Sequence, residues 1–107
     1  PQGLHLVEVK GVTLEENGHA RFPDAPTERG VRHLGELERA AAEGLGATAF
    51  FVIQMEGMTD FAPNDATHPA FGEALRHAAE HGVRVEAWEC AVTPESLRIV
   101  RPVEVRL

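Results

Sequence analysis

The sequence is poor in several residue types, and each shortage excludes a class of protein. A single cysteine, Cys90, excludes an internal disulfide and favours a reducing compartment. No apolar run is long enough to cross a bilayer, and no basic-then-apolar signal segment opens the chain. We therefore expect a cytoplasmic protein without a membrane partner.

Positive charge is also scarce. The ten lysines and arginines stand against 17 acidic residues, and a domain with a net charge of -7 repels polyanions as a whole. Several basic groups nevertheless fall close together between positions 10 and 33, namely Lys10, Arg21, Arg29, Arg32 and His33. The sequence therefore permits a local nucleic-acid face and excludes a broad basic surface.

The length and the composition are those of one globular domain. With 107 residues, 43% of them apolar, the chain can bury a modest core, and we expect residues 1–107 to form a single domain. The chain opens with Pro1-Gln2-Gly3, without a methionine, and becomes strand-like almost at once. This opening favours a fragment or a processed chain.

Hydrophobic periodicity predicts a mixed α/β fold with one mixed sheet and two helices. Asn17-Gly18 is a strong turn pattern, and the segment between positions 54 and 68 is expected to be a polar loop. The expected elements are strand 4–12, a short antiparallel strand 19–22, helix 27–43, central strand 47–53, a helix from Pro69 to Gly82, strand 83–90, and edge strands 96–100 and 103–107.

The stretch "HLVEVKGVTL" contains Glu8 and Lys10, the only lysine of the chain. In a strand, side chains two residues apart point to the same side. A carboxylate can then hold a divalent cation while the lysine orients the attacking water, as phosphodiester cleavage requires. As a motif the pair is weak, and a solvated pair on a half-exposed strand is the simpler interpretation of these two residues alone.

The stretch "FPDAPTERGVRHL" places Asp24 and Thr27 where helix caps are expected. Arg29 and His33 are four residues apart and share one face of the expected helix, next to Arg32. Positive charge in the first turns opposes the helix dipole, so its placement there favours a role in binding an anion such as phosphate. The alternative is an ordinary cap followed by a solvated helix face.

Five stretches together resemble one known family. In chain order they are "HLVEVKGVTL", "FPDAPTERGVRHL", "FFVIQ", "FAPND" and "GVRVEAWECAVTPESLRI", and the similarity to the sugar fermentation stimulation protein A family covers the whole chain. The C-terminal half of this family resembles nucleases of the PD-(D/E)xK restriction-endonuclease type and follows an OB-like domain. The resemblance implies that the OB-like domain and the first part of the nuclease-like core lie upstream of Pro1.

The same resemblance implies a metal-dependent nuclease site. Glu8 matches the metal-binding catalytic acid and Lys10 the catalytic lysine, with Mg²⁺ or Mn²⁺ as the cofactor. The implied partner is DNA or RNA, and the implied context is regulation of sugar, notably maltose, metabolism. Asp24 follows the strand of Glu8, whereas the aspartate of the nuclease motif precedes it, so Asp24 is not that aspartate.

The remaining candidates are binding or supporting residues. We expect Thr27, Arg29, Arg32 and His33 to contact nucleic acid, with Asp24 and Gln54 in supporting positions.

Two functions from different classes stay open. One is a metal-dependent nuclease, which the retained lysine favours. The other is a non-catalytic, non-specific DNA-binding regulatory module derived from a nuclease fold, which the acidic net charge and the acid missing upstream favour for this chain.

Other patterns in the chain have simpler explanations. His77 and His81 are four residues apart on the second expected helix and could bind zinc, although a solvated helix face explains them as well. We expect Trp88 to belong to the core rather than to stack on bases. Cys90 ends an apolar strand, where a thiol is usually inert.

Overall fold

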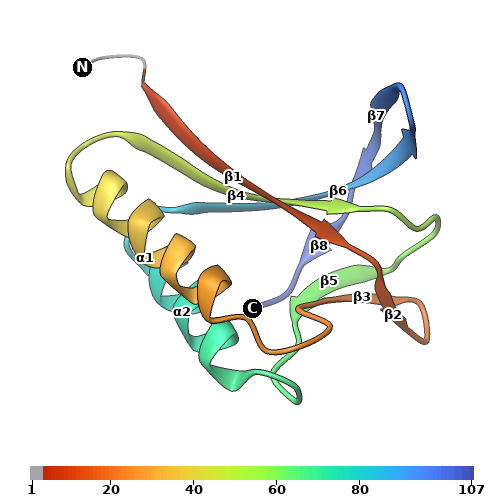
Figure 1. Ribbon diagram of the computed structural model, residues 1–107, viewed down its shortest axis with the longest axis horizontal. Coiled ribbons are helices and arrows are strands. Elements are labelled where there is room, and N and C mark those ends of the chain that lie inside the picture. The colour runs from red at the N-terminus through yellow and green to blue at the C-terminus, as the bar shows by residue number, and fades with distance from the viewer. Residues whose placement is uncertain (1–3) are drawn as a thin grey trace.

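The computed structural model describes residues 4–107, which form eight strands and two helices. In chain order these are β1 (His5–Val12), β2 (Leu14–Glu16), β3 (His19–Phe22), α1 (Glu28–Ala42), β4 (Gly46–Ile53), β5 (Asp60–Pro63), α2 (Pro69–Glu80), β6 (Arg84–Thr93), β7 (Ser96–Pro102) and β8 (Glu104–Val105). The mixed α/β class with two helices is confirmed (Figure 1).

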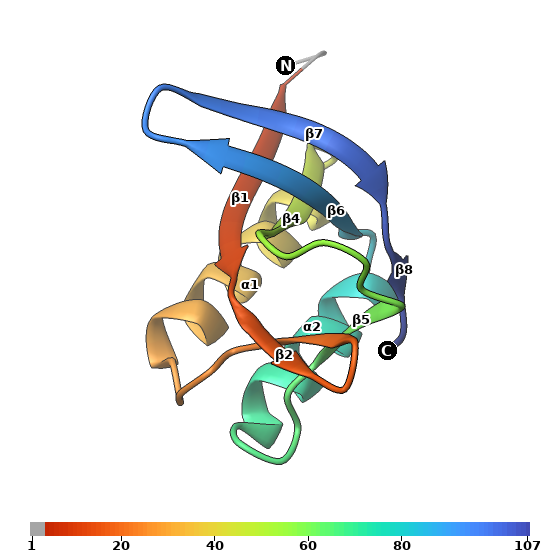
Figure 2. The same cartoon turned by 90° about the vertical axis from the view of Figure 1, so that its right-hand side faces the viewer.

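The first sheet has the strand order β1-β4-β6-β7. Strands β1, β4 and β6 are parallel, and β7 runs antiparallel to β6. Both helices lie on the same side of the parallel strands (Figure 1). β4 is central and six of its eight residues are buried, as its continuous apolar sequence predicts. Figure 2 shows the long β6–β7 hairpin projecting to one side of the molecule.

A second sheet, with the order β2-β3-β5-β8, corrects the expectation of a single sheet. β2 and β3 form the antiparallel pair around the turn at Asn17 and Gly18, both of which have positive φ. β5 pairs in parallel with β3 and β8, within the segment expected to be a polar loop. The pattern missed β5 because a strand of four residues is too short to display a period of two.

Each helix begins and ends close to the expected residue. The hydroxyl of Thr27 caps α1 by accepting a hydrogen bond from the Gly30 N–H at 2.9 Å. Gly44 and Gly82 follow the two helices with φ of 87° and 98°, a backbone conformation that favours glycine. Neither α1 nor α2, the helices found in residues 4–107, is long and apolar enough to span a membrane.

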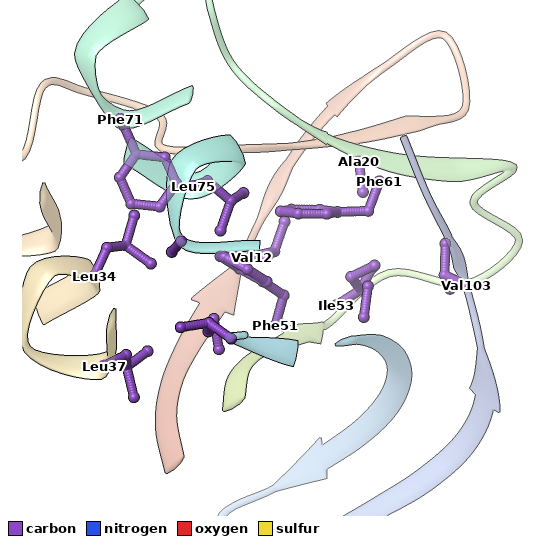
Figure 3. Packing of buried hydrophobic residues seen from close by; sticks show 14 of the residues in the cluster. Val12, Ala20, Leu34, Leu37, Phe51, Ile53, Phe61, Phe71, Leu75 and Val103 are labelled. Atoms are coloured by element: carbon purple, nitrogen blue, oxygen red, sulfur yellow. The ribbon is translucent and has the colours of Figure 1, made fainter. Parts of the chain in front are cut away.

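The core lies between the helices and the two sheets (Figure 3). Phe51 of β4 stacks on Phe61 of β5 with ring centroids 4.4 Å apart, and Phe71 of α2 meets Phe51 edge-on at 6.4 Å. Leu34 and Leu37 supply the buried face of α1. A single aromatic cluster therefore joins both sheets to the helical layer.

Candidate functional site

Glu8 and Lys10 lie on the same face of β1, as the period of two predicts. Their side chains are in contact, with 3.4 Å between Glu8 Oε1 and Lys10 Nζ. Val12, two residues further on, is fully buried in the core, whereas Val7 and Val9 on the other face are about half exposed. The acid and the lysine therefore face the helical layer, where the core packing fixes the position of their strand.

His33, in the second turn of α1, completes the site. Its Nδ1 lies 2.8 Å from Lys10 Nζ and 3.1 Å from Glu8 Oε1. The side chains of Lys10 and His33 are only 16% and 15% exposed, and that of Glu8 is 34% exposed, so solvent reaches the group mainly through the carboxylate. We call Glu8, Lys10 and His33 the β1–α1 cluster.

The distances within the β1–α1 cluster define how its hydrogen bonds run. An ammonium group only donates, and a carboxylate only accepts. The short contact is therefore the Lys10 ammonium donating to His33 Nδ1, with Glu8 as the second acceptor on the same ammonium. A neutral His33 whose Nδ1 accepts carries its proton on Nε2, which leaves an N–H free to donate to a ligand.

Within residues 4–107, the backbone of β1 offers an unpaired carbonyl oxygen beside Glu8. The carbonyls of Leu4 and Val12 accept hydrogen bonds from the N–H groups of Gly46 and Gln54, so even-numbered residues of β1 turn their backbone groups toward β4. Odd-numbered residues turn theirs the other way. Among the strands of residues 4–107, β4 alone pairs with β1. The Val9 carbonyl, between Glu8 and Lys10, therefore faces an open edge.

The α1 start carries the exposed positive charge that the sequence predicted there. Arg29 and Arg32 are exposed, and neither forms an ion pair within the part of the chain that the structure describes. Asp24 is exposed just before the helix. Thr27 has a structural task, because its hydroxyl caps α1 and its N–H donates to His68 Nδ1 at 3.2 Å.

The structure separates the predicted residue Gln54, and Arg21 of the basic group, from the β1–α1 cluster. Gln54 follows β4, and its amide lies beside Gly11, where an added Cβ would come within 3.0 Å of Gln54 Nε2. Gly11 is an odd-numbered position of β1, so this amide lies on the face opposite to Lys10. Arg21 donates to Asp60 at 2.9 Å and is not part of the basic group near α1.

Gln54 instead lines a pocket of about 280 Å³ between the end of β4 and the β6–β7 hairpin. Glu89, 6% exposed, borders this pocket and accepts hydrogen bonds from Arg101 Nε at 2.8 Å and from the Gly57 N–H at 3.1 Å. Burial and the neighbouring Glu89 charge raise the pKa of the Cys90 thiol. A raised pKa disfavours the thiolate, which agrees with the expectation of an inert cysteine.

A buried acid that the sequence reasoning missed lies in the second sheet. Asp60, 3% exposed, accepts from His19 Nδ1 at 3.0 Å and from Arg21 Nη1 at 2.9 Å. Burial raises the pKa of Asp60, but the hydrogen bonds and charges of Arg21 and His19 outweigh it, so that the pKa lies below its ordinary value. This group joins β3 to β5 and is structural.

Comparison with known proteins identifies the family. Residues 2–96 match the family model described as the sugar fermentation stimulation protein RE domain. The chain belongs to the sugar fermentation stimulation protein family. The family predicted from the sequence is thereby confirmed.

Curated relatives and a solved structure agree with this membership. A sugar fermentation stimulation protein homolog of Clostridium perfringens (strain SM101 / Type A) is 51% identical over 106 residues, which are 99% of this chain and 46% of the homolog. The homolog of Desulfitobacterium hafniense (strain Y51) is 54% identical over 102 residues, 95% of this chain and 45% of that protein. This chain thus spans less than half the length of these relatives.

The solved structure is that of Pyrococcus furiosus SfsA in complex with Ca²⁺. It matches with a TM-score of 0.85 and 29% sequence identity, and the match covers 94% of this chain and 44% of that one. The architecture described above is therefore the architecture of the corresponding part of that protein.

Proposed function

We propose that the β1–α1 cluster is the reaction centre of a metal-dependent phosphodiesterase acting on nucleic acid. The observation that carries this proposal is the environment of Lys10. The only lysine of the chain is largely buried and contacts both an acid on its own strand and a histidine 23 positions away. A solvated surface pair would require neither burial nor a histidine partner.

The oxygen atoms of the cluster suit a hard divalent cation. The Glu8 carboxylate and the Val9 carbonyl are adjacent on β1, and Mg²⁺ typically binds one or two carboxylates while keeping several waters. When bound, Mg²⁺ or Mn²⁺ would supply charge neutralisation at the phosphate and an acidified water. The Pyrococcus furiosus relative was solved with Ca²⁺, which also prefers oxygen ligands. Further ligands would come from the rest of the intact protein.

Each residue of the cluster then has a defined task. Glu8 holds the cation at the open edge of β1. The Lys10 ammonium donates a hydrogen bond to the attacking water and orients it toward the phosphorus. His33 keeps Lys10 in place through Nδ1, and its Nε2–H is free to donate to a phosphate oxygen.

The exposed arginines at the start of α1 would bind the flanking phosphates. Arg29 precedes His33 by four residues, so the two lie on one helical face. The N–H groups of the first helical turn add positive potential to the same region. Such contacts recognise the backbone and not the bases, which agrees with non-specific binding of DNA or RNA.

A non-catalytic DNA-binding module is the second candidate, acting in the cytoplasm in the regulation of sugar, notably maltose, metabolism. The observation that favours it is that Glu8 is the only carboxylate in the β1–α1 cluster among residues 4–107. One carboxylate holds a divalent cation weakly. In that case the same arginines bind DNA, and Lys10 serves as one more positive charge.

Cleavage by the intact protein distinguishes the two functions. We expect single-stranded or duplex DNA or RNA to be cut in Mg²⁺ or Mn²⁺ and not in chelator, and Glu8→Gln to abolish cutting. Glu15→Gln is the matched control, because Glu15 is exposed on β2 outside the cluster. Binding without cutting under all these conditions would establish the regulatory module and reject the nuclease.

A further inference from the structure

A second group of metal-binding side chains lies where α1 packs against α2. Glu38 of α1, His77 of α2 and His81, the C-cap residue of α2, each offer one ligand atom, and these atoms all lie within 4.8 Å of one another. His77 Nδ1 is 2.7 Å from Glu38 Oε1. The two imidazole rings are stacked, with centroids 4.1 Å apart and planes inclined by 19°. We call these residues the α1–α2 triad.

The convergence follows from the helix geometry. His77 lies in the last turn of α2 and His81, four residues later, is its C-cap residue, so both side chains lie on one side of this helix end. The C-terminal ends of α1 and α2 lie close together. A Cβ added at Gly82 would be only 3.5 Å from the Ala41 Cβ. The α2 segment reads His-Ala-Ala-Glu-His, in which the histidine spacing is the one that zinc hydrolases use for two of their metal ligands.

His81 is held as a metal-ligating histidine usually is. Its Nδ1 lies 2.7 Å from the backbone carbonyl of His77, which can only accept, so Nδ1 carries the proton and donates it. The lone pair is then on Nε2. A histidine whose other ring nitrogen donates to a backbone carbonyl has a defined tautomer and a ring oriented for coordination.

We propose that the α1–α2 triad binds a borderline divalent transition-metal ion of the Zn²⁺ class. Two imidazole nitrogens and one carboxylate oxygen suit Zn²⁺, Co²⁺ or Ni²⁺, whereas Mg²⁺ and Ca²⁺ require oxygen ligands. Three protein ligands leave a fourth position for water. Ligand atoms around tetrahedral Zn²⁺ are roughly 3.3 Å apart. The ligand atoms of the triad, all within 4.8 Å of one another, would have to come closer by about 1.5 Å or less to bind such an ion.

The exposure of the triad defines its role as a clamp between helices. The His77 side chain is 61% exposed, and zinc-assisted hydrolysis needs a dry, shaped cavity around the metal. A metal held by one ligand from α1 and two from the C-terminal end of α2 instead stabilises the packed pair by mass action. Because α1 also carries His33, the clamp holds the helix that supports Lys10.

Zinc titration of the intact protein, in excess Mg²⁺ to occupy oxygen sites, tests this proposal. We expect calorimetry to show one bound Zn²⁺ ion per protein that requires the triad. Saturation with Zn²⁺ should raise Tm by a few degrees, and a chelator should reverse this increase. His81→Asn or Glu38→Gln should weaken binding by at least about tenfold. With Co²⁺ as the probe, the same variants should lose the visible absorption of a four-coordinate site.

Three control variants separate the triad from other sites. Glu36→Gln changes an exposed acid of the same helix, His5→Asn removes a histidine of β1, and Glu8→Gln disrupts the β1–α1 cluster. All three should bind Zn²⁺ as the unaltered protein does. Absence of Zn²⁺ binding, or equal affinity in the triad variants and the controls, would overturn the proposal. So would loss of binding in Glu8→Gln alone.

Discussion

At the scale of single residues, Lys10 is distinguished by its surroundings. The chain has nine arginines and one lysine, and among residues 4–107 only the lysine is enclosed between an acid and a histidine at a strand–helix contact. An ammonium is a compact donor that can direct one N–H at a water, whereas a guanidinium is a planar fork. The chemistry of this position should therefore depend on the type of cation and not on its charge alone.

Replacement of Lys10 by arginine tests that dependence. We expect Lys10→Arg to abolish metal-dependent cleavage by the intact protein, because the larger planar group cannot occupy the same place between Glu8 and His33. Thermal unfolding measured in parallel excludes loss of fold as the cause. Undiminished cleavage by a stable Lys10→Arg protein would count against a catalytic lysine.

The histidine partner gives a second test at this scale. His33→Ala removes the acceptor that positions Lys10, and we expect kcat to fall by roughly 10- to 100-fold with little change in KM. His33→Asn places a carbonyl oxygen near the position of Nδ1 and should restore part of the rate. Equal rates for the alanine and asparagine variants would show that His33 does not act through Lys10.

At the scale of elements, α1 carries residues of both side-chain clusters as well as its own cap. Its start carries the Thr27 cap and the exposed Arg29, its second turn carries His33, and its third carries Glu38 of the α1–α2 triad. The buried stripe around Leu34 and Leu37 holds the helix against the sheet. Any movement of α1 would therefore alter both groups of side chains together.

Phosphate binding by the helix start has a measurable signature. We expect Arg29→Ala to weaken DNA binding similarly for unrelated sequences and to reduce the salt-dependence slope by about 0.9, the value for one lost phosphate contact on duplex DNA. Arg39→Ala is the matched control, because Arg39 is exposed near the other end of the same helix. Filter-binding titrations at several salt concentrations, with chelator present, measure both. An unchanged slope for Arg29→Ala would place the phosphate contact elsewhere.

At the scale of the whole molecule, two sheets share one core, and a buried carboxylate ties the strands of the second sheet together. Asp60 links β5 to His19 and Arg21 of β3, and Arg106, beyond β8, lies 3.5 Å from the same carboxylate. Folding lowers the pKa of Asp60 despite its burial. The ionised form is therefore bound more favourably in the folded state, and stability is linked to pH through this residue.

The sign of this linkage is fixed by the direction of the shift. A lowered pKa contributes stability that is present above the ordinary carboxylate pKa of about 3.9 and is lost as pH falls through the lower folded value. We expect Asp60→Asn to cost about 1.5–3 kcal/mol at neutral pH and to flatten the acid side of the stability profile. Urea unfolding between neutral and acid pH measures both, with Asp24→Asn as an exposed control. Parallel acid profiles would contradict this linkage.

Much of the local structure could be predicted because it depends on local rules. Alternation in β1, the continuous apolar run of β4 and the glycines after each helix placed those elements within a few residues. The two-residue alternation of a strand was sufficient to predict that Glu8 and Lys10 lie on the same face of β1, and the motifs identified the family. The short strand β5 has too few residues for a periodic pattern, so the sequence predicts a loop where the structure has a strand.

The partners of each side chain were decided by the tertiary structure, because packing joins residues that are distant in sequence. The core brings α1 against β1 and so gives Lys10 its contact with His33, while Gln54, just after β4, lies beside Gly11 on the other face of β1. Pairing of β3 with β5 engages Arg21 with Asp60 and removes it from the basic group near α1. The sequence determines the chemistry of each side chain and the periodicity of each element. Which of several suitable side chains a residue contacts depends on which elements the shared core holds together.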